Sequence, residues 1–136
     1  MRGVISVWHY EGFPRNYHGY HLNADADGCV FLKGLMDRLR DGRFPDGKEI
    51  KLAPPRAAQL AVPNCRAKCV SATHLDLRYR RDAPDDHFAI EDRDGRLVIE
   101  MGLSKLAEFE RGIDDICRGE GDWAIHGVGR SLWFWW

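Results

Sequence analysis

The fold class is decided by residues 73–101, which read THLDLRYRRDAPDDHFAIEDRDGRLVIEM. Apolar and polar side chains alternate over residues 73–80, which predicts a strand with one buried face and one wet face. Two further strand-like runs, 87–91 and 96–101, flank Asp92-Arg93-Asp94-Gly95, whose Asp-Gly pair favours a tight hairpin turn. Strands joined by short turns in this way predict a largely antiparallel sheet.

Helical periodicity occurs on both sides of this strand region. Residues 103–118 place apolar side chains at helical spacing, and residues 24–41 do the same earlier in the chain. Asn23 is the expected N-cap of the earlier helix. Gly112 lies inside the later helix, where it weakens the helix by roughly 1 kcal/mol relative to alanine, a cost that close packing would explain.

The complete pattern predicts an α+β protein. We expect one domain over residues 1–136, because a chain of 136 residues is long enough for one core and short for two. We expect a largely antiparallel sheet of about five to seven strands, with the two helices (about 24–41 and 103–118) on one face. The remaining segments are expected to be strands at 3–10, 49–53, 122–126 and 132–136 and loops at 11–22 and 54–72.

Charge and hydropathy exclude several classes of protein. The chain has 20 basic and 21 acidic side chains, so no overall field attracts nucleic acid or an anionic membrane. No apolar run is long enough to cross a bilayer, so we expect no membrane partner. The first ten residues lack the features of a secretory signal, which favours a cytoplasmic location. The four cysteines are therefore expected to be reduced, with Cys29 and Cys117 on apolar helix faces.

The segment Leu132-Trp133-Phe134-Trp135-Trp136 is the most unusual feature of the sequence. As a strand it places Leu132, Phe134 and Trp136 on one face and Trp133 and Trp135 on the other. The second face is either covered by the long loops or exposed as an apolar patch of the kind that marks an interaction site. Our first hypothesis is a small cytoplasmic binding domain whose partner is another protein or its own copy. Its contact surface would comprise Trp8, Tyr10, Trp133, Trp135 and Trp136.

A histidine-rich and tyrosine-rich stretch near the N-terminus carries the alternative. His9, His18 and His21 could converge on a divalent metal, with Tyr17 and Tyr20 shaping a pocket, as in a small metal-assisted enzyme. No complete metal or catalytic motif accompanies them, so no cofactor is predicted, no catalytic residue is assigned, and a binding protein is favoured over an enzyme.

Two further possibilities depend on short segments. Arg78, Arg80 and Arg81 lie around the polar face of one strand, where aromatic neighbours could help to bind single-stranded nucleic acid. The net charge disfavours this second alternative. Cys65 and Cys69 flank Arg66 and Lys68, whose charges would lower a thiol pKa in an exposed segment and make it reactive.

Overall fold

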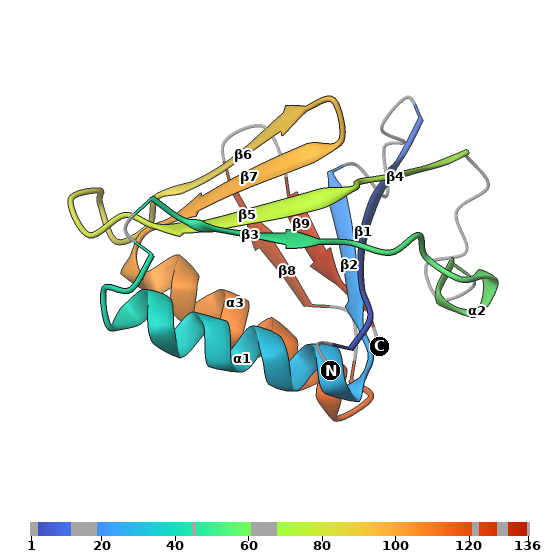
Figure 1. The fold of residues 1–136 in the computed structure, drawn as a ribbon, viewed down its shortest axis with the longest axis horizontal. Helices are drawn as coiled ribbons and strands as arrows, with labels where there is room; N and C mark the ends of the chain where they lie inside the picture. The colour runs from blue at the N-terminus through green and yellow to red at the C-terminus, as the bar shows by residue number, and fades with distance from the viewer. Residues whose placement is uncertain are drawn as a thin grey trace.

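The protein combines two β-sheets with a pair of long helices (Figure 1). The structure is a computed structural model that describes residues 3–11, 19–44, 46–60, 68–120, 123–127 and 131–135. Along these residues the elements are β1 (Ile5–Tyr10), β2 (Tyr20–Ala24), α1 (Ala26–Arg40), β3 (Lys48–Lys51), α2 (Ala57–Leu60), β4 (Cys69–Ser71), β5 (His74–Tyr79), β6 (Phe88–Arg93), β7 (Arg96–Met101), α3 (Leu103–Cys117), β8 (Trp123–His126) and β9 (Ser131–Phe134).

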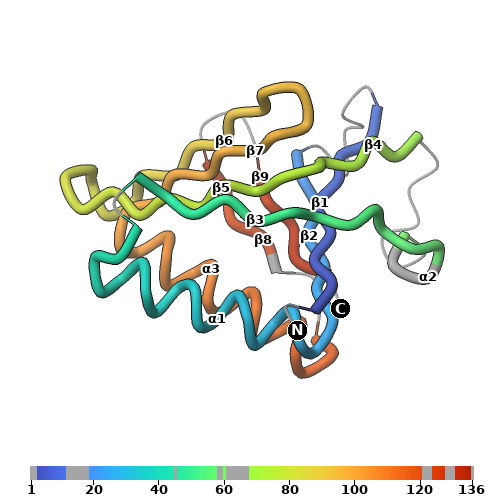
Figure 2. Tube along the Cα trace, viewed as in Figure 1, coloured from blue at the N-terminus to red at the C-terminus, as the bar shows by residue number. Residues whose placement is uncertain are grey.

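The strands form two mixed sheets. One sheet has the order β4-β1-β2-β9-β8, and the other has the order β3-β5-β7-β6. Only Ala72 and Thr73 separate β4 from β5, so the chain passes directly from the first sheet into the second (Figure 2). The α+β class is confirmed. The expected count of five to seven strands is too low, and β2–β9 and β5–β7 are parallel pairs in an otherwise antiparallel arrangement.

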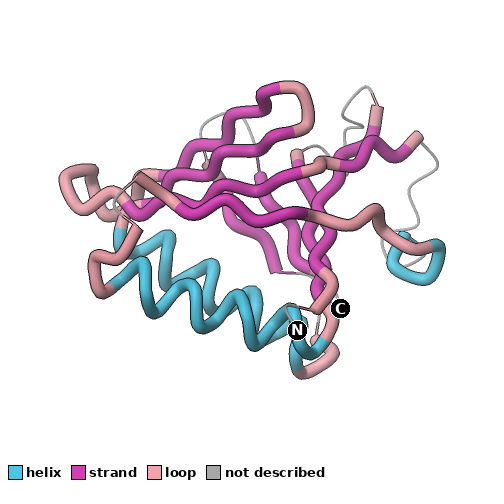
Figure 3. The backbone as a smooth tube through the Cα atoms, in the orientation of Figure 1, coloured by secondary structure: helices cyan, strands magenta, loops and turns pink. Residues whose placement is uncertain are grey.

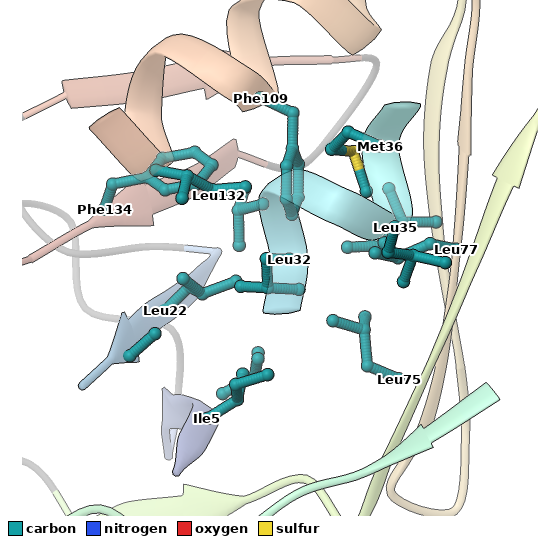
Figure 4. Close-up of a cluster of buried hydrophobic side chains, with 14 of the residues drawn as sticks. Ile5, Leu22, Leu32, Leu35, Met36, Leu75, Leu77, Phe109, Leu132 and Phe134 are labelled. Atoms are coloured by element: carbon teal, nitrogen blue, oxygen red, sulfur yellow. The ribbon is translucent and has the colours of Figure 1, made fainter. Parts of the chain in front are cut away.

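The core lies between the helices and both sheets. Helices α1 and α3 run antiparallel, side by side, beneath the strands (Figures 1 and 3). Their apolar stripes supply Leu32, Leu35 and Phe109, which pack with Leu22 from the first sheet and Leu75 from the second (Figure 4). Both predicted helices are confirmed, since 3.6-residue spacing gave each a single buried face.

No helix in the described part of the chain is long and apolar enough to cross a membrane.

Helix α1 begins two residues later than its expected cap implies. The N-cap is Asp25, whose carboxylate accepts hydrogen bonds from Gly28 N at 2.7 Å and from Val4 N at 2.9 Å. Asn23, the expected cap, belongs to β2, and its amide donates to the carbonyl of Trp135. The Asp25 carboxylate therefore caps the helix and also fixes the start of β1.

The predicted hairpin is confirmed. Strands β6 and β7 meet at the pair Arg93–Arg96, leaving Asp94 and Gly95 as a two-residue loop. Both loop residues have positive φ, 55° and 89°, as a type I′ turn requires. Asp92 Oδ1 accepts a hydrogen bond from Gly95 N at 2.8 Å and closes the turn.

Strand β2 corrects the loop expected over residues 11–22. Tyr20–Ala24 pairs with β1 on one side and with β9 on the other, and all five residues are buried. A strand buried on both faces shows no alternation of apolar and polar residues, so the sequence pattern does not predict it. Residues 12–18 of the expected loop lie outside the described part. Within the expected 54–72 loop, the structure forms the one-turn helix α2 and the short strand β4.

Candidate functional site

Aromatic side chains cover the face of the first sheet that is turned away from the helices. The cluster consists of Trp8 and Tyr10 from β1, His21 from β2, and Trp133 and Trp135 from the β9 region, and we call it the indole cluster. The ring planes of Trp8, Trp133 and Trp135 lie nearly parallel to that of His21, at interplanar angles of 13–18° and centroid distances of 5.7–6.4 Å. Trp135 Nε1 donates a hydrogen bond to His21 Nδ1 at 2.8 Å.

The indole cluster is buried, which changes the interpretation of these aromatic residues. Trp8, Tyr10 and Trp135 are at most 6% exposed, and only Trp133 is half-buried. Trp136 lies outside the described residues. Among the described residues the exposed large apolar side chains are far apart in the sequence: Val4 before β1, Val30 in α1 and Leu103 at the start of α3. The described aromatic residues therefore form a second core and not an open contact surface.

The histidines of the proposed metal site do not converge as expected. His21 pairs with Trp8 across the β1–β2 ladder and belongs to the indole cluster. His9 follows Trp8 in β1, so its side chain points to the opposite face of the same sheet. His18 and Tyr17 lie outside the described residues. Within the described part, no group of three histidine, cysteine or acidic side chains is arranged to hold a metal ion. His9 and His21 cannot bind one ion together.

His9 instead lines an open cleft of about 520 Å³ where the two sheets meet. Its wall from the first sheet includes His9 and Tyr20, whose rings contact edge to face at 5.4 Å between centroids. The β6–β7 hairpin supplies the opposite wall with Asp92 and Asp94. We call this the His9–Asp92 cleft, and its described lining is completed by Val70, Ser71, Thr73 and Gly95.

Asp92 is held in a fixed position at the mouth of the cleft. Tyr20 is 1% exposed, and its hydroxyl donates to Asp92 Oδ2 at 2.9 Å. The other oxygen, Oδ1, accepts from Gly95 N. Each carboxylate oxygen can still accept a second hydrogen bond. Asp92 itself is exposed, so a fixed anionic acceptor faces solvent within the cleft.

The charged side chains that line this cleft are acidic. Its described lining contains two carboxylates, Asp92 and Asp94, and no lysine or arginine. The arginines of the hairpin are engaged elsewhere: Arg93 pairs with Glu91 and Arg96 pairs with Glu49. The hydroxyl groups of Ser71 and Thr73 add polar atoms to the lining. Such a lining favours a ligand that is positively charged and rich in hydrogen-bond donors.

Two other clefts lie in different places. One of about 610 Å³ is bounded by β6, the start of α3 and the end of β8, and includes His87 and His126. Another of about 220 Å³ lies between the end of α1 and the end of β5. Neither contains a residue of the predicted metal or aromatic sites, whereas the His9–Asp92 cleft contains His9 and Tyr20.

The arginines proposed for nucleic acid are bound within the protein. Arg78 pairs with Asp76 at 2.9 Å, Arg80 pairs with Glu100 at 2.8 Å, and Arg81 donates to the carbonyl of Arg40. Each contact uses part of the hydrogen-bonding capacity of its guanidinium group, and in two of the three cases it places a carboxylate beside the positive charge.

The Glu100 ion pair gives a pH-dependent prediction. Its hydrogen bond from Arg80, with a weaker contribution from His87, holds the pKa of Glu100 below its ordinary value. A carboxyl group with a lowered folded-state pKa stabilises the fold above its unfolded pKa, and this stabilisation is lost as the pH falls through the folded value. We expect Glu100→Gln to reduce the free energy of unfolding at pH 7 by up to about 1 kcal/mol, because the pair is partly exposed. Urea unfolding should show the difference from the wild type disappearing near pH 2.

The control is Glu120→Gln, at an exposed position beyond α3. It should change stability little at either pH. A Glu100→Gln deficit that persisted at pH 2 would assign the loss to packing and contradict the ion-pair explanation.

The thiol prediction for Cys69 is not supported by its surroundings. Cys69 is half-buried in β4, and burial raises the pKa of its thiol, which opposes the effect expected from the flanking basic residues. Cys65 lies outside the described residues. Cys117, expected on an apolar helix face, is exposed, whereas Cys29 is buried as expected.

Comparison of the chain with protein family models, with curated proteins and with solved structures finds no match. Function is therefore inferred from the side chains and their contacts. The sequence indicated His9 and Tyr20 but missed Asp92, Asp94 and Thr73 as their companions in one cleft. The Asp-Gly turn located Asp92 within a hairpin, but its distance of 72 residues from Tyr20 gave no sign that the two would meet.

Proposed function

We propose that this chain is a binding protein that takes up a small cationic molecule, such as an organic amine, in the His9–Asp92 cleft. The supporting observation is the exposed Asp92 carboxylate held by two hydrogen bonds, one from the buried Tyr20 hydroxyl and one from Gly95 N. A carboxylate fixed before binding loses little conformational entropy when the ligand arrives. The size of the cleft lies within the range of small-molecule sites.

This proposal keeps the binding role expected from the sequence and moves its site. The expected surface of Trp8, Tyr10 and the C-terminal tryptophans has its described members largely buried, whereas the cleft offers accessible polar groups. Binding to another protein or to a second copy of the chain stays a prediction, and no surface among the described residues favours it.

The test uses three probes of equal chain length: 1,4-diaminobutane, 1,4-butanediol and succinate. They differ mainly in charge, so they separate electrostatic recognition from shape. We expect only the diamine to raise the thermal midpoint of the full chain in buffer of moderate ionic strength, because ligands that bind the folded state stabilise it. Amide chemical shifts in an NMR titration should change at His9, Thr73 and Gly95. Equal responses to all three probes, or none to the diamine, would overturn the proposal.

The Asp92→Asn variant assigns the site. It keeps the shape of the side chain and one acceptor oxygen for Gly95 N, while its amide NH2 can donate to the Tyr20 hydroxyl, and it removes the negative charge. We expect the diamine affinity to fall by about 10-fold to 100-fold, the loss typical of a charged hydrogen bond. The matched control is Asp86→Asn, an exposed acidic residue that lines the 610 Å³ cleft instead. Affinity unchanged in Asp92→Asn, or reduced equally in both variants, would place binding elsewhere.

A further inference from the structure

A pair of cysteines lies across the contact between α1 and α3. The ion pair between Lys33 Nζ and Asp114 Oδ1, 2.7 Å apart, shows which positions of the two helices lie opposite each other. The helices are antiparallel (Figure 1). The residue one turn before Lys33 on α1 therefore lies opposite the residue one turn after Asp114 on α3. Those positions are Cys29 and Cys117. The two thiols are close enough for Cys117 to affect the pKa of Cys29.

The two thiols have contrasting environments. Cys29 is 0% exposed and faces the core, while Cys117 is exposed in the last turn of α3. Burial, followed by the contact with Cys117, raises the pKa of the Cys29 thiol to about 12. A reagent in solution can reach Cys117, whereas Cys29 is protonated and shielded. Only a partner already bonded to Cys117 comes within reach of Cys29.

We propose that Cys29 and Cys117 form a reversible disulfide by exchange with a small-molecule disulfide such as oxidised glutathione. In the first step the Cys117 thiolate attacks one sulfur of the reagent, which forms a mixed disulfide and releases one glutathione thiolate. In the second step the Cys29 sulfur attacks the Cys117 sulfur, gives up its proton and releases the second glutathione. The two protein thiols are oxidised by two electrons, and the reagent is reduced to two thiols that carry the two protons.

The bond would join the N-terminal part of α1 to the C-terminal end of α3. Because the residues are far apart in sequence, the cross-link restricts the unfolded chain strongly. It closes a loop containing most of the strands, so the oxidised protein should unfold at a temperature on the order of 10 °C higher than the reduced protein.

The test is oxidation of the purified full chain in glutathione buffers of increasing ratio of disulfide to thiol. We expect mass spectrometry to show the loss of two hydrogen atoms and digestion to yield a peptide pair joined through Cys29 and Cys117. The thermal midpoint should rise with the oxidised fraction and return to its starting value on reduction. Oxidation confined to other cysteines, or no internal bond at any ratio, would overturn the proposal.

Three variants separate the two steps. Cys29→Ala should stop the reaction at the mixed disulfide, so that one glutathione remains on Cys117. Cys117→Ser should leave Cys29 unmodified, because the buried thiol meets no reagent directly. Cys69→Ser is the control and should oxidise as the wild type does. If Cys29→Ala accumulated no adduct, or if Cys117→Ser still lost the Cys29 thiol, the assigned order of attack would be wrong.

Discussion

Replacing Gly112 with alanine should destabilise the protein, while the same replacement at Gly34 should stabilise it. Both glycines lie inside long helices, where alanine is normally preferred by roughly 1 kcal/mol. A Cβ atom on Gly112, however, would lie 2.7 Å from ring carbons of Phe134. That ring is fully buried and packs edge to face against Phe109 at 5.2 Å between centroids, so it has little room to move.

We therefore expect Gly112→Ala to lower the free energy of unfolding by about 1–3 kcal/mol, the usual cost of overpacking a core. At Gly34 the nearest atom to a new Cβ is the far end of the flexible Arg38 side chain at 3.3 Å, which donates to Gly34 O and can shift by a few tenths of an ångström, so the helix preference for alanine should prevail. Urea unfolding of the two variants measures both signs in one experiment. A stable Gly112→Ala protein would contradict the close packing of α3 against β9.

Replacing Trp135 with phenylalanine should be more damaging than the same replacement at Trp8, although both side chains are buried in the indole cluster. Trp135 Nε1 donates to the buried His21 Nδ1, and the variant loses this hydrogen bond. We expect a loss of about 2–4 kcal/mol, which combines the lost buried hydrogen bond with the smaller ring volume.

Trp8 provides the matched control, because its Nε1 is buried with no hydrogen-bond partner among the described residues. Trp8→Phe removes the same ring atoms and breaks no described hydrogen bond, so its cost should be smaller by about 1 kcal/mol or more. Unfolding followed by far-UV circular dichroism avoids the change in tryptophan fluorescence. Equal losses in the two variants would show that ring volume, and not the contact with His21, dominates the energetics of the cluster.

Local signals in the sequence predicted the parts of the fold that local physics determines. The Asp94-Gly95 turn has the two positive φ angles that its residues favour, and both long helices have the buried faces implied by their spacing. Gly112 was also explained correctly by close packing. For the turn and the helices the deciding interaction lies within a few residues or along one face of one element, whereas the partner of Gly112, Phe134 in β9, could not be named from the sequence.

Long-range pairing could not be predicted in the same way. Strand β2 reads Tyr-His-Leu-Asn-Ala, a mixed sequence whose edges pair with β1 and β9 and whose two faces are buried by the main core and by the indole cluster. The parallel pairing of β2 with β9 depends on the arrangement of the complete sheet. The same limitation applies to the His9–Asp92 cleft, whose walls come from different sheets.

The position of β9 inside the first sheet has a consequence for synthesis of the protein. β9 lies between β2 and β8, and the contact of Asn23 with Trp135 joins residues 112 positions apart. While the nascent chain emerges from the ribosome, β2 therefore has an unpaired edge until almost all of the described residues have been made. Unpaired edges promote association between chains. Shielding by chaperones during translation should raise the yield of soluble protein more than chaperones added after release.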